Sequence, residues 1–206
     1  MSEIAAGAIG LTGGSEYDES HLIRRCREQD TEAFRWLVLR YQARIYNFVR
    51  RMVSDPDDAE DVTQDVFLKA FRNIRRYDGR AALTTWLFKI AANLCVDRAR
   101  RRKRRGDAVS LDESYSASFL VPADARWNPE QLAVAAEMKQ AVEAAIAAMS
   151  DKLRPVVLLH DMEGLEYQEI ADALGIPLGT VKSRLFLARG HLQAALAPFM
   201  GGGNEE

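Results

Sequence analysis

The apolar residues of this chain recur at intervals of three and four along almost every segment, and no segment alternates apolar with polar residues. From Thr31 to Val53 this spacing lines one face of a helix, and it returns after Pro56, Thr85 and Pro129. The sequence therefore predicts an all-α fold. Hydrophobic residues make up 48% of the chain, enough for packed cores. No apolar run approaches the roughly 20 residues that span a bilayer.

Residues 106–128 interrupt the helical pattern. The stretch GDAVSLDESYSASFLVPADARWN is rich in Ser, Ala and Asp and has no helical repeat. We interpret it as a flexible linker that joins two small helical domains, residues 19–105 and 129–198. Residues 1–18 lack the basic start of a signal peptide and are predicted to be a disordered leader, with residues 199–206 as a flexible tail.

The second domain ends in two helices separated by a turn that contains glycine. A short helix is predicted from Glu166 to Leu174, Gly175 suits its left-handed cap, and a longer helix runs from about Gly179 to Leu196. A helix-turn-helix of this kind places its second helix in the major groove of DNA. The side chains outside the apolar stripe of that helix are Thr180, Lys182, Ser183, Arg184, Phe186 and Arg189. They offer donors to guanine and an aromatic group to the thymine methyl. An amphipathic hairpin with a solvated face is the alternative.

Positive charge is concentrated in the first domain. The whole chain has 28 Lys and Arg against 30 Asp and Glu, yet residues 66–105 hold 13 basic and 2 acidic side chains. Aromatic residues are interleaved with this charge, as in surfaces that grip single-stranded nucleic acid through phosphates and stacked bases. Tyr77, at a break between helices, is the candidate for an exposed stacking residue, whereas Phe71 and Trp86 fit a core better. A charged run such as Arg98–Arg105 is also compatible with a solvated tail.

The sequence shows no arrangement typical of a catalytic or metal site. Cys26 and Cys95 lie far apart, and the 3 histidines are scattered, without the spacing of a disulfide framework or a zinc site. The carboxylates of DAEDVTQD share one helix, where they cap and repel, and no nucleophile–base pair stands at motif spacing. We expect no catalysis, no cofactor and no metal, and the cytoplasm is the expected location.

Three stretches together resemble the extracytoplasmic-function sigma factors, minimal initiation factors of bacterial transcription. They are DAEDVTQDVFLKAF (58–71), TWLFKIAANLCVDRAR (85–100) and EGLEYQEIADALGIPLGTVKSRLFLAR (163–189), in the order of the family. The resemblance implies that residues 19–105 form a region 2-like domain for core polymerase binding and for recognition and melting of the −10 element. It implies that residues 129–198 form a region 4-like domain for the −35 element.

The resemblance also implies roles for single residues. Asp61, Gln64 and Asp65 would bind the clamp helices of the largest polymerase subunit, and the polymerase flap would be a second contact. The −10 element and the melting strand would be contacted by Arg76, Tyr77, Asp78, Gly79, Arg80, Leu83, Lys89, Asn93, Asp97, Arg98, Arg100 and Arg101. The six outward residues of the last helix would read the −35 element, with Arg154 on the DNA backbone. An anti-sigma factor would be the inhibitory partner.

The chain departs from the family pattern at three places. Ala81-Ala82-Leu83 stands where the capture loop often has Ser-Ser-Phe, which leaves the identity of the captured base open. Glu166 replaces a usual Ser cap and predicts a weaker helix start. Leu187 replaces a commonly basic residue, so the −35 preference should differ.

The main alternative is a helix-turn-helix regulator that acts without polymerase and uses residues 20–105 as a sensor or dimerisation module. A sensor with a basic, strand-gripping surface would be unusual, and the sequence shows no signature of a ligand pocket. An enzyme that acts on nucleic acid is a third class, for which the sequence offers no catalytic constellation.

Overall fold

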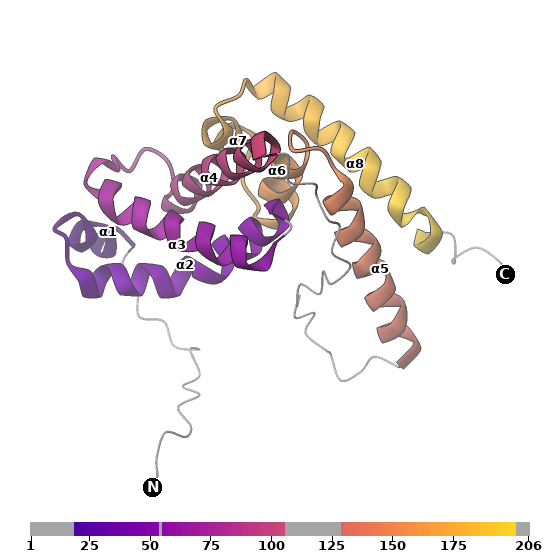
Figure 1. Ribbon diagram of the computed structural model, residues 1–206, viewed down its shortest axis with the longest axis horizontal. Helices are drawn as coiled ribbons and strands as arrows, with labels where there is room; N and C mark the ends of the chain where they lie inside the picture. Colours follow the sequence, from indigo (N-terminus) through magenta and orange to yellow (C-terminus); the bar gives the residue numbers. More distant parts are fainter. Residues whose placement is uncertain (1–18, 54, 106–128, 201–206) are drawn as a thin grey trace, which may run out of the picture.

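The computed structural model describes residues 19–53, 55–105 and 129–200, so the predicted leader, the linker and most of the tail lie outside the described residues (Figure 1). Its elements are α1 (Glu19–Arg27), α2 (Thr31–Met52), α3 (Pro56–Asn73), the 3-10 helix η1 (Ile74–Arg76), α4 (Leu83–Arg105), α5 (Pro129–Ala148), α6 (Arg154–Val157), the π-helical turn η2 (Leu158–Met162), α7 (Tyr167–Leu174) and α8 (Leu178–Met200). The prediction of an all-α fold is confirmed. Among these elements no helix has the length and apolar character needed to cross a membrane.

Helices α1 to α4 build a first module around the apolar face of α2. Leu37, Ile45 and Phe48 of α2 are fully buried, as their spacing predicts. Phe48 meets Phe88 of α4 edge-on, with 5.3 Å between the ring centroids. Edge-to-face pairs of this kind add stabilisation beyond the area that they bury. The core of this module therefore fixes the orientation of α4, the helix that carries the basic run.

The ends of the helices in the first module follow local chemistry. The Asp55 carboxylate caps α3 by accepting from the backbone N–H groups of Asp57 and Asp58 at 2.8 and 3.1 Å, and Pro56 occupies the first turn. This start was predicted and is confirmed. Helix α4 begins at Leu83, two residues before the predicted start at Thr85.

Helices α5 to α8 build the second module. The helix that follows α5 begins at Arg154. This start leaves Pro155 in the first turn, where its missing N–H breaks no helical hydrogen bond. Gly175 ends α7 with φ 63° and ψ 40°, the predicted left-handed cap. Helix α8 continues to Met200, beyond the predicted end at Leu196.

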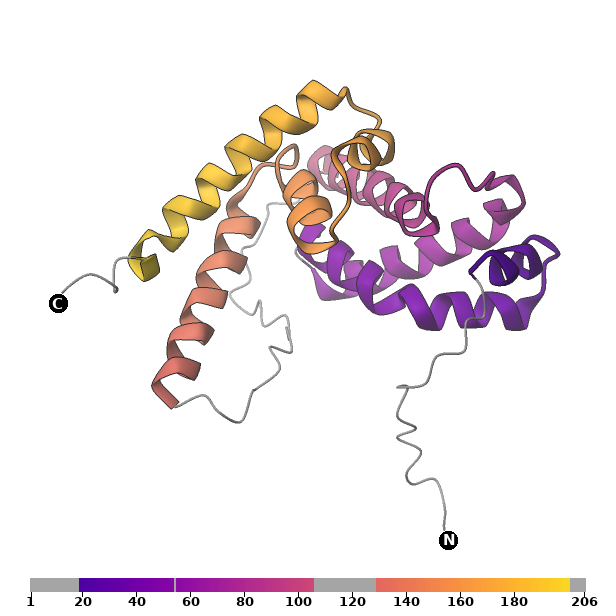
Figure 2. The ribbon, with the colours of Figure 1, turned by 180° about the vertical axis from the view of Figure 1, so that it is seen from behind.

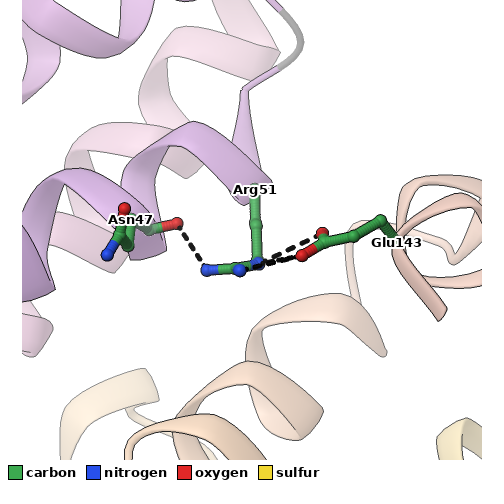
Figure 3. A network of polar contacts seen from close by, with 3 residues as sticks. All are labelled: Asn47, Arg51 and Glu143. Carbon is green, nitrogen blue, oxygen red and sulfur yellow. Dashed lines mark hydrogen bonds and ion pairs between the residues drawn. The ribbon is translucent and has the colours of Figure 1, made fainter. Parts of the chain in front are cut away.

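The two modules pack against each other, with α7 lying on α4 in both views (Figures 1 and 2). At one point of the contact, Arg51 of α2 forms a nearly fully buried ion pair with Glu143 of α5 (Figure 3). Arg51 Nη2 lies 2.8 Å from Glu143 Oε1, and Arg51 Nε donates to both carboxylate oxygens at 3.3 and 3.2 Å. Arg51 Nη1 also donates to the Asn47 carbonyl at 3.3 Å. The sequence predicted two domains but not this contact.

Further polar contacts cross the boundary between the modules. The Thr85 hydroxyl of α4 donates to Glu169 Oε1 of α7 at 2.7 Å. The same Glu169 side chain accepts from the Glu166 backbone N–H at 2.9 Å, which supports the helix start that the missing Ser was expected to weaken. Arg44 Nε of α2 donates to Glu163 Oε2 at 3.0 Å. Burial raises the pKa of Glu163, and Arg44 only partly opposes this rise.

The turn between α1 and α2 contains a residue in a conformation that favours glycine. Gln29 has φ 66°, and a side chain in this left-handed region costs roughly 1–2 kcal/mol. We expect Gln29→Gly to raise the free energy of unfolding by about 0.5–1 kcal/mol, measured by urea denaturation. Gly175→Ala is the opposite test: nothing lies within 4 Å of the added Cβ, so backbone strain alone should destabilise the chain. Equal effects of the two changes would contradict this explanation.

Candidate nucleic-acid and polymerase interface

Helix α8 presents a mixed face of cations, hydroxyls and an aromatic ring. Lys182, Ser183 and Phe186 are exposed, Phe186 by 79%, while Thr180 and Arg184 are half-buried. The inner stripe of the helix is buried against the rest of the module and consists of Val181, Leu185 and Ala188. The structure therefore brings the predicted reading residues together at the N-terminal half of one helix, as major-groove recognition requires.

Arg189 lies at the edge of this face and is already engaged. Its Nη2 lies 2.5 Å from Asp161 Oδ1 of η2. Arg189 also lines a shallow concavity together with Tyr167, Lys182 and Phe186. The ion pair holds the guanidinium of Arg189 near this face of α8.

Arg154 does not lie where the resemblance placed it. Its guanidinium donates to the carbonyls of Ile146, Ala147 and Met149 at 3.1, 2.6 and 2.7 Å, and to the Met52 carbonyl at 3.3 Å. These bonds satisfy carbonyls at the end of α5, which have no partner within the helix. In this structure Arg154 therefore caps a helix, and its contact with the DNA backbone stays a prediction.

Two predicted contacts of the −10 element are buried. Tyr77 is only 6% exposed; its ring packs on Trp86 and its hydroxyl donates to the Ala81 carbonyl at 2.6 Å. Leu83 is fully buried. The expectation of an exposed, stacking Tyr77 is wrong, because the ring closes the loop between η1 and α4 from inside. Leu83 likewise contributes to the core rather than to a binding surface.

The remaining residues of this loop are accessible. Arg76, Asp78, Gly79 and Arg80 are exposed. The Asp78 carboxylate accepts from the Arg80 backbone N–H at 3.0 Å and pairs with its guanidinium at 3.3 Å. This local turn leaves the loop residues exposed to solvent, while the buried Tyr77 holds the loop against the core.

A line of exposed side chains runs along α4. Lys89, Asn93 and Asp97 follow one another at intervals of one helical turn and are all exposed. Arg100 and Arg101 continue the line, and with Lys103, Arg104 and Asp97 they surround a shallow concavity. Only Asp97 interrupts the positive charge, 3.9 Å from Arg100 Nη1. This surface can follow several phosphates in succession.

Arg98 turns away from that line. Its guanidinium forms a close ion pair with Asp58 in the first turn of α3. This bond holds the pKa of Asp58 below its ordinary value, against the effect of burial. In this structure Arg98 ties α4 to the acidic start of α3, and its contact with the melting strand stays a prediction.

The outer face of α3 combines acidic residues with an apolar groove. Asp61, Gln64 and Asp65 are exposed, as predicted. Beside them, a groove between α2 and α3 is lined by Phe34, Val38, Gln42, Thr63, Gln64, Phe67, Leu68 and Phe71. Sequence reasoning missed this groove; the signal was Leu68, which falls outside the apolar stripe of α3 and is 52% exposed.

The comparisons with known proteins identify the family. Sigma-70 region 2 matches residues 37–105 and sigma-70 region 4 matches residues 139–192. The RNA polymerase sigma-H factor of Pseudomonas aeruginosa is 33% identical over 189 residues, which cover 90% of this chain and 97% of that protein. The ECF RNA polymerase sigma-E factor of Escherichia coli K12 is 33% identical over 181 residues, 87% of this chain and 94% of that protein. The chain belongs to the extracytoplasmic-function sigma factors.

Two solved structures share the fold of this chain. The sigma factor RpoE from Bartonella quintana, in complex with the anti-sigma factor NepR, has a TM-score of 0.60 and 27% identity over 80% of this chain and 96% of that chain. CnrH, in complex with the cytosolic domain of CnrY, also reaches 0.60, with 23% identity over 86% of this chain and 96% of that chain. The sigma factor described here binds core RNA polymerase and directs initiation by recognising −10 and −35 elements and melting the −10 region.

Proposed function

We propose that this sigma factor divides its work among three surfaces and performs no catalysis of its own. The acidic face of α3, with Asp61, Gln64 and Asp65, holds the polymerase. The exposed line along α4 and the loop before it follow the melted −10 strand, and the outer face of α8 reads the −35 duplex. One observation carries this division: the three surfaces are exposed, chemically distinct, and lie on different helices of one chain.

The packed arrangement of the modules limits when these surfaces can act together. The two promoter elements lie about 25 base pairs apart, which is about 85 Å of duplex. In this structure α7 lies on α4 and leads directly into α8, so the −35 reader stands beside the −10 reader (Figures 1 and 2). The modules must therefore separate when the sigma factor engages a promoter on the polymerase.

We also propose an anti-sigma factor as the regulatory partner and the cytoplasm as the location. The likeness to RpoE, whose solved structure contains an anti-sigma factor, supports such a partner. The groove between α2 and α3 offers it apolar anchors next to the polymerase-binding carboxylates. A partner bound there would compete with the polymerase for α3.

Transcription in a purified system tests the proposed function. Core RNA polymerase with this chain should start transcripts at promoters that share two upstream elements, identified beforehand by mapping transcript starts after overexpression. The isolated chain should bind the same duplex weakly. Tight dimeric binding to a palindrome, with polymerase activity unchanged, would instead favour a regulator that acts alone.

Substitutions on α8 and α4 should separate sequence reading from phosphate binding. Lys182→Ala or Arg184→Ala should cost on the order of 1–3 kcal/mol at the −35 element if either side chain contacts a base in two places. Neutralising Arg100 and Arg101 should weaken binding to all sequences and lower the salt dependence by roughly one unit per lost phosphate contact. Both are measured by titrating promoter and non-promoter DNA with holoenzyme at several salt concentrations. An unchanged salt dependence would show that the basic run is a solvated surface that does not contact phosphates.

A further inference from the structure

A second basic surface lies at the end of the first module, outside the line along α4. Arg24 and Arg27 are exposed on the outer face of α1, opposite the buried Leu22 and Cys26. They are three residues apart and therefore lie on one side of the helix, separated by about 4.5 Å along its axis.

This face of α1 adjoins the loop that leads to the −10 element. α1 packs against η1, and both lie at the same end of the molecule in the two opposite views (Figures 1 and 2). Arg75 and Arg76 of η1 are exposed there as well. Arg27 is close enough to the loop to influence Tyr77: burial raises the pKa of this hydroxyl, and Arg27 partly opposes the rise.

The guanidinium groups of this surface are free to bind an external anion. Other arginines of the module are engaged, such as Arg25, which pairs with Asp30 at 2.7 Å. In the described part of the chain, no ion pair engages Arg24, Arg27, Arg75 or Arg76. Four cations without an ion pair on two helices that pack against each other favour a polyanion as partner.

The composition of the surface favours nucleic acid over a protein. Protein interfaces depend on buried aromatic or aliphatic anchors. Among the described residues of α1, η1 and the loop before α4, no large apolar side chain is exposed. The polymerase-binding face of α3 differs, because it has Leu68 and the apolar groove. Arginines without apolar anchors are typical of contacts with phosphates.

We infer that Arg24 and Arg27 of α1, together with Arg75 and Arg76 of η1, bind the phosphate backbone of the melted promoter strand where it continues past the base-capture loop. This inference rests on the proposed function of that loop. It extends the path of the strand from α4 around the end of the module to α1. The contact is independent of base sequence, because guanidinium groups on phosphates carry no sequence information.

Binding of single-stranded oligonucleotides to holoenzyme tests this inference. The probes carry the non-template −10 sequence of a mapped promoter and either end at that element or extend eight nucleotides beyond it on the 5′ or the 3′ side. For the unchanged chain, extension on one side should strengthen binding. Arg24→Ala with Arg27→Ala should remove most of that gain, on the order of tenfold at 0.1 M salt, and lower the salt slope by roughly 0.7 for each lost contact.

Matched controls separate this surface from a general loss of charge and from the proposed function itself. Arg35→Ala with Lys152→Ala removes the same charge at exposed positions elsewhere and should preserve the gain from extension. Equal losses for short and long probes, or equal losses in the control variant, would overturn the inference. So would a loss of affinity for core polymerase with DNA binding intact, which would assign the surface to an acidic protein. If the unchanged chain fails to bind even the short probe, the proposed function of the loop fails instead.

Discussion

Reversing the charge of Asp61 and Asp65 together, with Asp61→Arg and Asp65→Arg, is expected to abolish assembly with core RNA polymerase. Both carboxylates are exposed one turn apart on α3, beside the apolar groove. The proposed partner is the basic-edged pair of clamp helices, and like charges placed across an interface cost several kcal/mol. The affinity for core polymerase should therefore fall at least on the order of a hundredfold, measured by fluorescence titration of labelled sigma factor.

A charge-matched variant shows whether position or net charge is responsible. Glu137→Arg with Asp151→Arg makes the same change in net charge at exposed positions of the second module and should assemble normally. Both double variants should keep the melting temperature of the parent, because all four side chains are exposed. If the change on α3 leaves assembly unaffected, α3 does not bind the polymerase.

The sequence predicted the helices and their faces because a periodic pattern reports which side of a helix is buried. Phe186 and Leu185 on α8 show this well, since neighbours in sequence are exposed and buried as the 3.6-residue repeat requires. Loops have no such period. Tyr77 was expected to be exposed because Gly79 follows it closely. Its ring instead fills the space beneath the loop, and its hydroxyl donates a hydrogen bond to the Ala81 carbonyl. Only the tertiary fold supplies both the space and the carbonyl.

The partners of the arginines are the other feature that the sequence does not reveal. A guanidinium on a helix surface can serve DNA, a carboxylate or the end of another helix, and the sequence does not distinguish these partners. Arg98 pairs with Asp58, 40 residues earlier in the chain, and Arg154 donates hydrogen bonds to carbonyls at the end of α5. The ion pair between the modules could not be predicted from the sequence for the same reason. Glu143 lies 92 residues after Arg51, and nothing nearby in the sequence identifies Arg51 as its partner.

Glu143→Gln is expected to release the two modules from each other. The substitution keeps the size of the side chain but removes the carboxylate charge that pairs with Arg51, whose side chain is 4% exposed. Breaking a buried ion pair in this way costs about 3–5 kcal/mol. The modules can escape that cost by separating, which returns Arg51 to water. We therefore expect a larger radius of gyration in X-ray scattering and lost protection of the facing sides of α4 and α7 in hydrogen exchange.

The partner substitution and a second ion pair test this explanation. Arg51→Met with Glu143→Met removes both charges and should keep the modules together, because apolar side chains of similar volume replace buried ion pairs without loss. Glu163→Gln affects the pair with the more exposed Arg44, whose side chain is 45% accessible, and should cost less than about 1 kcal/mol. Because we propose that the modules separate on promoter binding, Glu143→Gln should also lower the concentration of core polymerase needed for half-maximal transcription. A compact Glu143→Gln protein with unchanged exchange would show that the packing of α7 on α4 holds the modules without the ion pair.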